Sequence, residues 1–294
     1  MNNSKTARIG LLIILVLALS FAFVLTKESE PIQNTKVTML DVGQGDSFLI
    51  QASNGKQMLI DGGKDATVLA ELAKVMPWGD RSIDIVLATH PDMDHIGGLD
   101  AVLKRYKVDM FLTSEVGGDT QEYKNLLSLV DKKKIPAYFV KAGMRFDLSS
   151  KDYFLVLFPD RDVSGWETNT GSVVGRFVSG PPAGGASVLF TGDSPAPIEQ
   201  YLAKKESNNL DVDILKLGHH GSRTSTTAAL LKVATPELAL ISAGKNNSYG
   251  HPHKEVLTLL KQFNVPYIST QTDGTVTFET DGVRWYRLSA QAGK

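Results

Sequence analysis

The chain contains no cysteine, and this absence removes several classes of site at once. Disulfide bonds, thiolate metal sites, thiol nucleophiles and lipid-modified cysteines are all excluded. Any metal ion must therefore be held by nitrogen and oxygen ligands.

A marked excess of charge of one sign is also absent. The chain has 31 basic and 32 acidic residues, and its longest basic run is the three lysines of DKKK at residues 131–134, which is typical of a solvated helix end. No global field attracts a polyanion, so a nucleic acid would have to bind in a local groove. No repeat of fixed period is visible.

A long apolar run occurs at the N-terminus, where Lys5 and Arg8 precede residues 9–25 (IGLLIILVLALSFAFVL). We expect residues 1–25 to form a signal peptide or membrane anchor, with a buried core helix as the alternative. Residues 26–35 predict a polar linker, and residues 36–294 predict one folded domain. Because the positive charges precede the run, this domain is expected outside the cytoplasmic membrane, either secreted or anchored by residues 9–25. The sequence leaves cleavage open.

From residue 36 onward, strand-like and helix-like segments alternate. Two β-rich runs flank the turn ASNG at residues 52–55 and predict a hairpin, and amphipathic runs such as residues 66–76 and 196–205 predict helices. Each half of the chain combines hairpins with strand–helix units. The expected fold class is therefore α/β, a four-layer αββα sandwich with two mixed sheets face to face.

Histidine is scarce, and its placement is informative. Two pairs directly follow predicted strands, and the third lies between a strand and a helix; the six residues are His90, His95, His219, His220, His251 and His253. Asp193 ends a fourth predicted strand. Reactive groups gather where the carboxyl ends of strands open into loops, so these positions predict one metal centre.

The richest cluster is THPDMDHIGG, residues 89–98. His90, Asp92 and Asp94 alternate and would project to one side of an extended segment, while His95 begins a turn whose helical entry Gly97 and Gly98 allow. Carboxylates this close together repel each other unless a cation lies among them. A polar turn with a core histidine is the purely structural alternative.

Three shorter motifs are weaker by themselves. LFTGD, ending at Asp193, is as typical of a simple turn, and YGHP at residues 249–252 equally fits a helix N-terminus. GHHGS at residues 218–222 is more specific, because flanking glycines allow a close approach to a ligand. A metal site would be excluded only if the purely structural explanation were correct for every one of these motifs.

These motifs resemble those of the metallo-β-lactamase fold hydrolases, and more closely the extracytoplasmic domain of ComEC-type DNA-uptake proteins. The resemblance covers about residues 36–290 and includes MLDVGQGDSFLI, MLIDGG, THPDMDHIGGLD, LFTGD, LKLGHHGS and YGHP in order. The family signature is His-x-His-x-Asp-His. Here Asp92 replaces the second histidine, and no histidine lies between His95 and His219. Asn169 and Ser172 lie in that stretch and either line the site or belong to a loop.

The resemblance implies two divalent metal ions, Zn²⁺ or Mn²⁺. His90 and Asp92 would hold one ion, Asp94 and His95 the second, and Asp193 would bridge them. His220 would complete the second site, with His219 as a pocket residue, although the two could exchange roles. Asp46 and Asp61 would either support ligand histidines or serve as plain turn residues.

The chemistry expected of such a site is hydrolysis by a metal-activated water. Asp94 or Asp193 would orient that water, and His251, with an ordinary pKa of ~6.5, would protonate the leaving oxygen. We expect a phosphodiesterase or nuclease acting on a phosphodiester or other ester substrate, which includes nucleic acid. The alternatives are hydrolysis of a lactam, a thioester or a cell-wall phosphocholine ester, and a non-catalytic metal-containing binding module. The sequence does not determine the oligomeric state.

Overall fold

The computed structural model describes residues 34–288. The predicted signal or anchor segment, and all but the last two residues of the predicted linker, lie outside the described residues. Within residues 34–288, no helix has the length and apolarity needed to cross a membrane.

Two mixed β-sheets form the centre of the molecule. In the first sheet, the strand order is β15 (Trp285–Arg287), β14 (Val276–Thr280), β1 (Thr35–Met39), β2 (Phe48–Gln51), β3 (Gln57–Ile60), β4 (Ser82–Ala88), β5 (Lys107–Thr113) and β6 (Ala137–Phe139). In the second sheet, it is β13 (Tyr267–Ser269), β12 (Leu238–Ile241), β11 (Ile214–Lys216), β10 (Ala186–Phe190), β9 (Val174–Ser179), β8 (Asp152–Phe158) and β7 (Arg145–Asp147).

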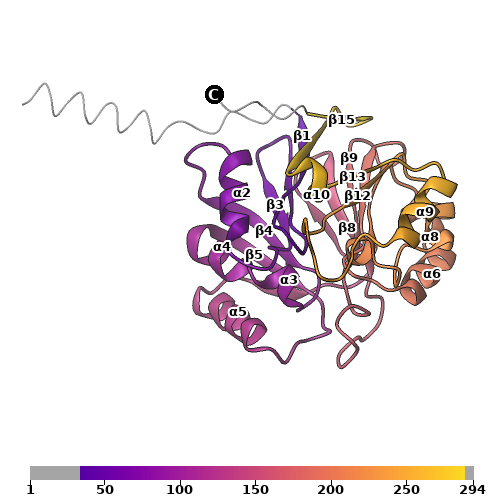
Figure 1. Ribbon diagram of the computed structural model, residues 1–294. Coiled ribbons are helices and arrows are strands. Elements are labelled where there is room, and N and C mark those ends of the chain that lie inside the picture. Colours follow the sequence, from indigo (N-terminus) through magenta and orange to yellow (C-terminus); the bar gives the residue numbers. More distant parts are fainter. Residues whose placement is uncertain (1–33, 289–294) are drawn as a thin grey trace, which may run out of the picture.

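Helices cover the outer face of each sheet, as Figure 1 shows. The first sheet carries α2 (Thr67–Val75), α4 (Leu99–Arg105) and α5 (Gln121–Lys132), and the second carries α6 (Ala196–Lys205), α8 (Ala228–Ala234) and α9 (Lys254–Gln262). Shorter elements are α3 (Met93–Ile96), α7 (Ser207–Leu210), α10 (Thr270–Asp273) and a 3₁₀ turn, η1 (Gly218–Gly221). The prediction of a four-layer αββα sandwich is confirmed.

Three apolar layers hold these elements together. Between the sheets, Phe48 packs edge-on against Phe190 with ring centroids 5.2 Å apart. Leu72 of α2 and Val102 of α4 pack on the first sheet, while Leu202 of α6 packs on the second. The central strands β2, β3, β10 and β11 are buried on both faces, because each sheet packs against the other sheet on one side and against helices on the other. Each helix buries one face, as its hydrophobic periodicity predicts.

Strand direction determines where the site lies. Strands β3 to β6 run parallel in the first sheet, and β10 to β13 run parallel in the second. The loops after β4, β10, β11 and β12 carry His90, Asp193, His220 and His251 respectively. The structure brings these four side chains into one cluster at the junction of the two sheets.

Candidate metal centre

Three buried imidazoles converge at this junction, and each is held through its Nδ1 atom. The Nδ1 of His95 lies 2.8 Å from Asp61 Oδ2, that of His220 lies 3.2 Å from Asp46 Oδ1, and that of His90 lies 2.9 Å from Thr89 Oγ1. Thr89 donates its own hydroxyl proton to Asp61 Oδ2 at 2.8 Å. All three partners therefore accept a hydrogen bond from the imidazole. This places the proton on Nδ1 and leaves the lone pair of Nε2 free to bind a metal ion.

The three Nε2 atoms are the clearest indication of a metal site. Each is buried and has no hydrogen-bond partner in the described structure, and so is Oδ1 of Asp193. Nε2 of His95 lies 3.3 Å from this Oδ1, and Nε2 of His220 lies 3.4 Å from Asp193 Oδ2. Buried polar atoms normally have partners, so four such atoms around one point indicate that a cation belongs there.

The remaining predicted ligands line the open side of the cluster. Asp94 Oδ2 lies 3.2 Å from His220 Nε2, and Asp92 Oδ2 lies 3.8 Å from His90 Nε2. Their side chains are 28% and 37% exposed, so the site is open to solvent on this side. His219 also borders the opening, with Nε2 3.7 Å from Asp193 Oδ2. The buried His220 fits a ligand better than His219, in agreement with the sequence-based preference.

Asp46 belongs to the cluster but is already engaged. One ligand-capable atom from each of Asp46, His95, Asp193 and His220 lies within 4.8 Å of the others. Asp46, however, accepts from His220 through Oδ1 and contacts the ammonium of Lys216 through Oδ2. We therefore assign Asp46, like Asp61, to holding an imidazole in place.

The backbone around His220 is shaped by its flanking glycines. His219 and His220 have φ angles of 49° and 55°, in the left-handed region that ordinary residues avoid. A Cβ atom at Gly218 would lie 2.9 Å from the Cβ of Ser225, and one at Gly221 would lie 2.7 Å from that of Pro252. The glycines of GHHGS thus permit the tight turn that points both imidazoles toward Asp193.

Lys216 is a site residue that the sequence analysis missed. Its side chain is 1% exposed, and its Nζ donates to Gly192 O at 2.9 Å while lying 3.6 Å from Asp193 Oδ1. Burial lowers the pKa of Lys216, but the charges of Asp46 and Asp193 outweigh burial and raise it above its usual value. The alternation of ILKL at residues 214–217 was the one available signal, because it places Lys216 on the same strand face as Ile214, which lies in the core between the sheets.

The cluster as a whole attracts positive charge. Burial lowers the pKa of His95, but the charges of Asp193 and Asp61 outweigh burial and raise it well above its usual value. For His220, the charges of Asp193 and Asp46 similarly outweigh burial and raise the pKa to about 9. A divalent ion can replace these protons, because metal binding to histidine releases them.

His251 lies beside the cluster in a different environment. Burial, followed by the charges of His220, His219 and His253, lowers the pKa of His251 to about 4. Its ring is therefore neutral near pH 7, and the expectation of an ordinary pKa is wrong. The neutral ring fits a hydrogen-bonding role better than the proton-donating role expected from the sequence.

The two residues proposed from NTGS have different surroundings. Ser172 is buried, and its Oγ accepts a hydrogen bond from the backbone N of Asp193 at 3.3 Å, so it helps to position Asp193. Asn169 lies in the loop between β8 and β9, and its Oδ1 is buried without a hydrogen-bond partner in the described structure. Ser172 therefore supports the site, while a contact between Asn169 and substrate stays a prediction.

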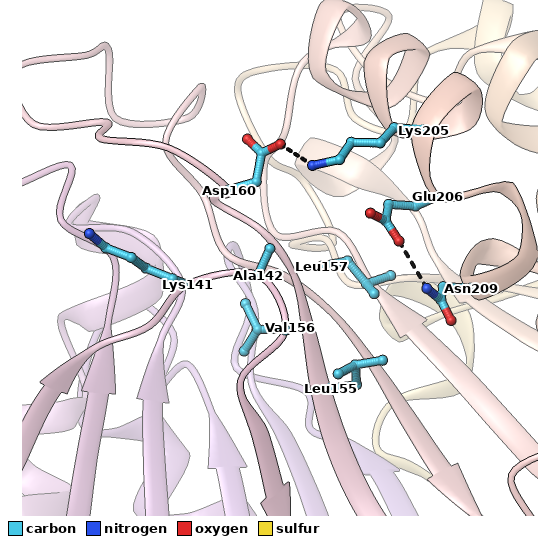
Figure 2. Close-up of a pocket in the computed structure, with 10 residues that line it drawn as sticks. Lys141, Ala142, Leu155, Val156, Leu157, Asp160, Lys205, Glu206 and Asn209 are labelled. Atoms are coloured by element: carbon cyan, nitrogen blue, oxygen red, sulfur yellow. Dashed lines mark hydrogen bonds and ion pairs between the residues drawn. The ribbon is translucent and has the colours of Figure 1, made fainter.

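A separate cavity of about 470 Å³ lacks the histidines that mark the candidate metal site (Figure 2). Its charged side chains are paired: Lys205 contacts Asp160, Lys141 lies 3.1 Å from Glu115, and Glu206 accepts from Asn209 Nδ2 at 2.9 Å. None of the six histidines lines it. The histidine cluster is therefore the stronger candidate for the functional site.

Comparison with known proteins agrees with this geometry. The Metallo-beta-lactamase superfamily matches residues 40–245, so the chain belongs to that superfamily and carries a candidate metal site of its metal-dependent hydrolases. The family predicted from the motifs is confirmed.

Curated relatives are competence proteins of the predicted ComEC-like branch. ComE operon protein 3 of Bacillus subtilis is 29% identical over 265 residues, covering 83% of this chain and 33% of that protein. Competence protein ComA of Neisseria gonorrhoeae is 30% identical, and the match covers 89% of this chain and 35% of that protein. Recombination protein 2 of Haemophilus influenzae is 31% identical, and the match covers 89% of this chain and 31% of that protein. The chain spans about a third of the length of these relatives.

Solved structures share the fold at low identity. Igni18, a metallo hydrolase from Ignicoccus hospitalis, superposes with a TM-score of 0.55 at 15% identity, covering 84% of this chain and all of that one. CmlA, a diiron β-hydroxylase from Streptomyces venezuelae, superposes with a TM-score of 0.54 at 14% identity, covering 89% of this chain and 55% of that one. These similarities show the architecture alone.

Proposed function

We propose that this protein is a metal-dependent phosphodiesterase whose substrates include nucleic acid. The observation that carries the proposal is the convergence of three partnerless Nε2 atoms with Asp193 at a solvent-open junction. A structural metal site is usually closed by four protein ligands, whereas this one has an exposed side formed by carboxylates. The relatives named for competence and recombination favour nucleic acid as the substrate class.

The residues present fit two divalent ions, Zn²⁺ or Mn²⁺, in this proposal. His90 and Asp92 would hold one ion, Asp94, His95 and His220 the other, and Asp193 would bridge both. When bound, the ions would supply Lewis-acid activation of water and charge stabilisation of the phosphoryl oxygens.

The protein's own groups then orient the reactants. Asp94 and Asp193 would orient the attacking water by accepting its hydrogens, and the neutral ring of His251 would hydrogen-bond to a substrate oxygen. Asp46 and Asp61 hold His220 and His95 in the ligating tautomer.

We further propose that the domain works outside the cytoplasmic membrane, secreted or anchored by residues 9–25. The basic residues Lys5 and Arg8 before this apolar run support the orientation.

The test is hydrolysis by the full chain, purified in detergent because residues 9–25 are apolar. We expect cleavage of a generic phosphodiester and of single-stranded DNA in added Mn²⁺ or Zn²⁺, and none in chelator. Asp94→Ala should abolish cleavage, whereas Asp100→Ala, on the exposed face of α4, should leave it unchanged. A folded, metal-depleted Asp94→Ala protein with full activity would refute the proposal. Bound metal without phosphodiester cleavage would favour a lactam, thioester or phosphocholine ester substrate, or a binding module.

A further inference from the structure

A cavity of about 290 Å³ adjoins the open side of the metal cluster. It shares Asp94 with that cluster, and its other lining residues are Gln44, Lys64, Met93, Asn247, Ser248 and Tyr249. Its volume is at the lower end of the range for small-molecule sites, so it would hold one compact group rather than a long ligand.

The walls of this cavity combine exposed apolar surface with a positive charge. Tyr249 is 63% exposed and Met93 is 44% exposed, although large apolar side chains are normally covered. Lys64, on the loop between β3 and α2, is also exposed. The cavity thus offers a flat aromatic surface and a cation beside a site rich in carboxylates.

Tyr249 is held in a preorganised position. Its ring stacks on His251, with centroids 5.6 Å apart and an angle of 21° between the planes. Asn247 holds the surrounding loop, because its Nδ2 donates to His251 O at 2.7 Å and its Oδ1 accepts from His251 N at 2.9 Å. A ring fixed in this way loses little entropy when a second flat group stacks on it.

We propose that this cavity is a nucleotide subsite, in which Tyr249 stacks on the base next to the scissile phosphate and Lys64 pairs with a neighbouring phosphate. The inference rests on the proposed phosphodiesterase function and specifies its substrate as single-stranded nucleic acid. An aromatic base beside a phosphate matches an aromatic side chain beside a cation. A choline headgroup fits less well, because Tyr249 is the one aromatic residue of the lining and Lys64 repels a cation.

Binding of phosphorothioate oligonucleotides in Mn²⁺, measured by fluorescence anisotropy, tests the subsite without requiring turnover. One probe is a short thymidine oligonucleotide, and the other is an abasic strand of equal length. Tyr249→Ala and Tyr249→Leu should weaken thymidine binding about ten- to a hundredfold and leave abasic binding within about twofold. Tyr249→Phe should retain wild-type affinity. Lys64→Met should weaken both probes and lower the slope of log affinity against log salt concentration by about 1.

Tyr267→Ala is the matched control, because Tyr267 is 47% exposed on β13, at the opposite end of its strand from the site loops. The subsite is wrong if wild-type protein binds neither probe, or if Tyr249→Ala affects both probes equally or neither. Cleavage of unmodified abasic and thymidine strands separates this result from the proposed function. Cleavage without a Tyr249 effect refutes the subsite alone, and Tyr249-dependent binding without cleavage refutes the proposed function alone.

Discussion

Single residues around the cluster act mainly by holding the ligands. Local motifs were enough to propose a place in the site for His90, His95 and Asp193. The motif IDGG was enough to propose a supporting role for Asp61. Lys216 could not, because one lysine in a strand pattern gives no sign of partners that are distant in sequence, such as Asp46. Its role arises only when β11 places it beneath the loop that carries Asp193.

The carboxylate of Asp61 is expected to set the metal affinity through His95. Asp61 accepts from Thr89 N, Thr89 Oγ1 and His95 Nδ1, each at 2.8 Å. Asp61→Asn tolerates the same left-handed backbone but replaces one acceptor oxygen with a donor. Calorimetric titration with Mn²⁺ or Zn²⁺ should show affinity reduced about 10- to 100-fold with an unchanged circular dichroism spectrum. Unchanged affinity would contradict the assigned role.

Lys216 is expected to stabilise the metal-free form by balancing buried carboxylates. Lys216→Met keeps the aliphatic length but leaves Asp46 without its cation, and losing one partner of a buried pair costs about 3–5 kcal/mol. Urea denaturation should show this loss in chelator and a smaller loss in saturating Mn²⁺, because the ion supplies positive charge. Lys104→Met, on the exposed face of α4, is the control. Equal losses with and without metal would contradict this role.

At the scale of elements, the paired glycines after HPDMDH serve the contact between two loops. Their sequence context predicts helix entry, and the structure shows a further reason for them. Gly98 N donates to Gly63 O at 3.0 Å, and Gly62 N donates to His95 O at 2.7 Å. A Cβ atom at Gly98 would lie 2.1 Å from Gly62 O and 2.5 Å from Asp65 O. The sequence could not reveal this contact because it depends on the loop after β3.

Gly98→Ala should therefore push the loop after β3 away from α3 and disturb His95. We expect a free energy of unfolding about 1–3 kcal/mol lower, together with weaker Mn²⁺ binding. Asp100→Ala, two residues further along α4, should change stability by less than about 0.5 kcal/mol. Thermal unfolding and metal titration of both variants check this, and a Gly98→Ala protein with wild-type stability would contradict it.

Strands β6 and β7 are elements for which the sequence gives little signal. Both are three-residue edge strands, and most of their side chains are exposed, so neither buries the alternate face that reveals a strand. The longer buried strands and amphipathic helices were predictable because their apolar periodicity reflects burial. Short edge strands form where a neighbouring strand offers free hydrogen-bonding groups, which is tertiary information.

At the scale of the whole molecule, Asp152 joins the two sheets at the end opposite the metal cluster. From the second sheet, it accepts from Thr35 Oγ1 of the first sheet at 2.8 Å and from Ser53 N at 3.2 Å. Burial raises the pKa of Asp152, but hydrogen bonds to its carboxylate, first that from Ser149 and then that from Thr35, outweigh burial and lower the pKa below its usual 3.8.

This lowered pKa gives a pH dependence of stability with a definite sign. Because the unfolded state binds the proton more tightly, the contribution of Asp152 is complete above about pH 4 and is lost as pH falls through the folded-state pKa. Asp152→Asn removes this titration and leaves a buried donor unsatisfied, at a cost of about 1–3 kcal/mol. Urea denaturation should show a wild-type advantage at pH 7 that shrinks near pH 3, with metal affinity unchanged. A pH-independent difference would contradict the account.

Side chains of the two sheets meet at both ends, at Asp152 at one end and at the candidate metal site at the other. At the metal-site end, two candidate ligands from the first sheet, His90 and His95, meet two from the second, Asp193 and His220. The sequence predicted that these residues would converge, because each follows a strand, but it did not predict the Nδ1 partners that orient them. Those partners come from neighbouring loops whose positions follow only from the packing of the layers.

The central claim is that the Nε2 atoms of His90, His95 and His220 form a metal centre with Asp193. The most direct measurement is calorimetric titration of the metal-free full chain with Mn²⁺ and Zn²⁺, for wild type, His95→Ala and His253→Ala. We predict tight binding by wild type and by His253→Ala, since His253 lies outside the cluster, and a loss of at least one bound ion by His95→Ala. Equal binding by all three proteins, or no binding by wild type, would contradict the account.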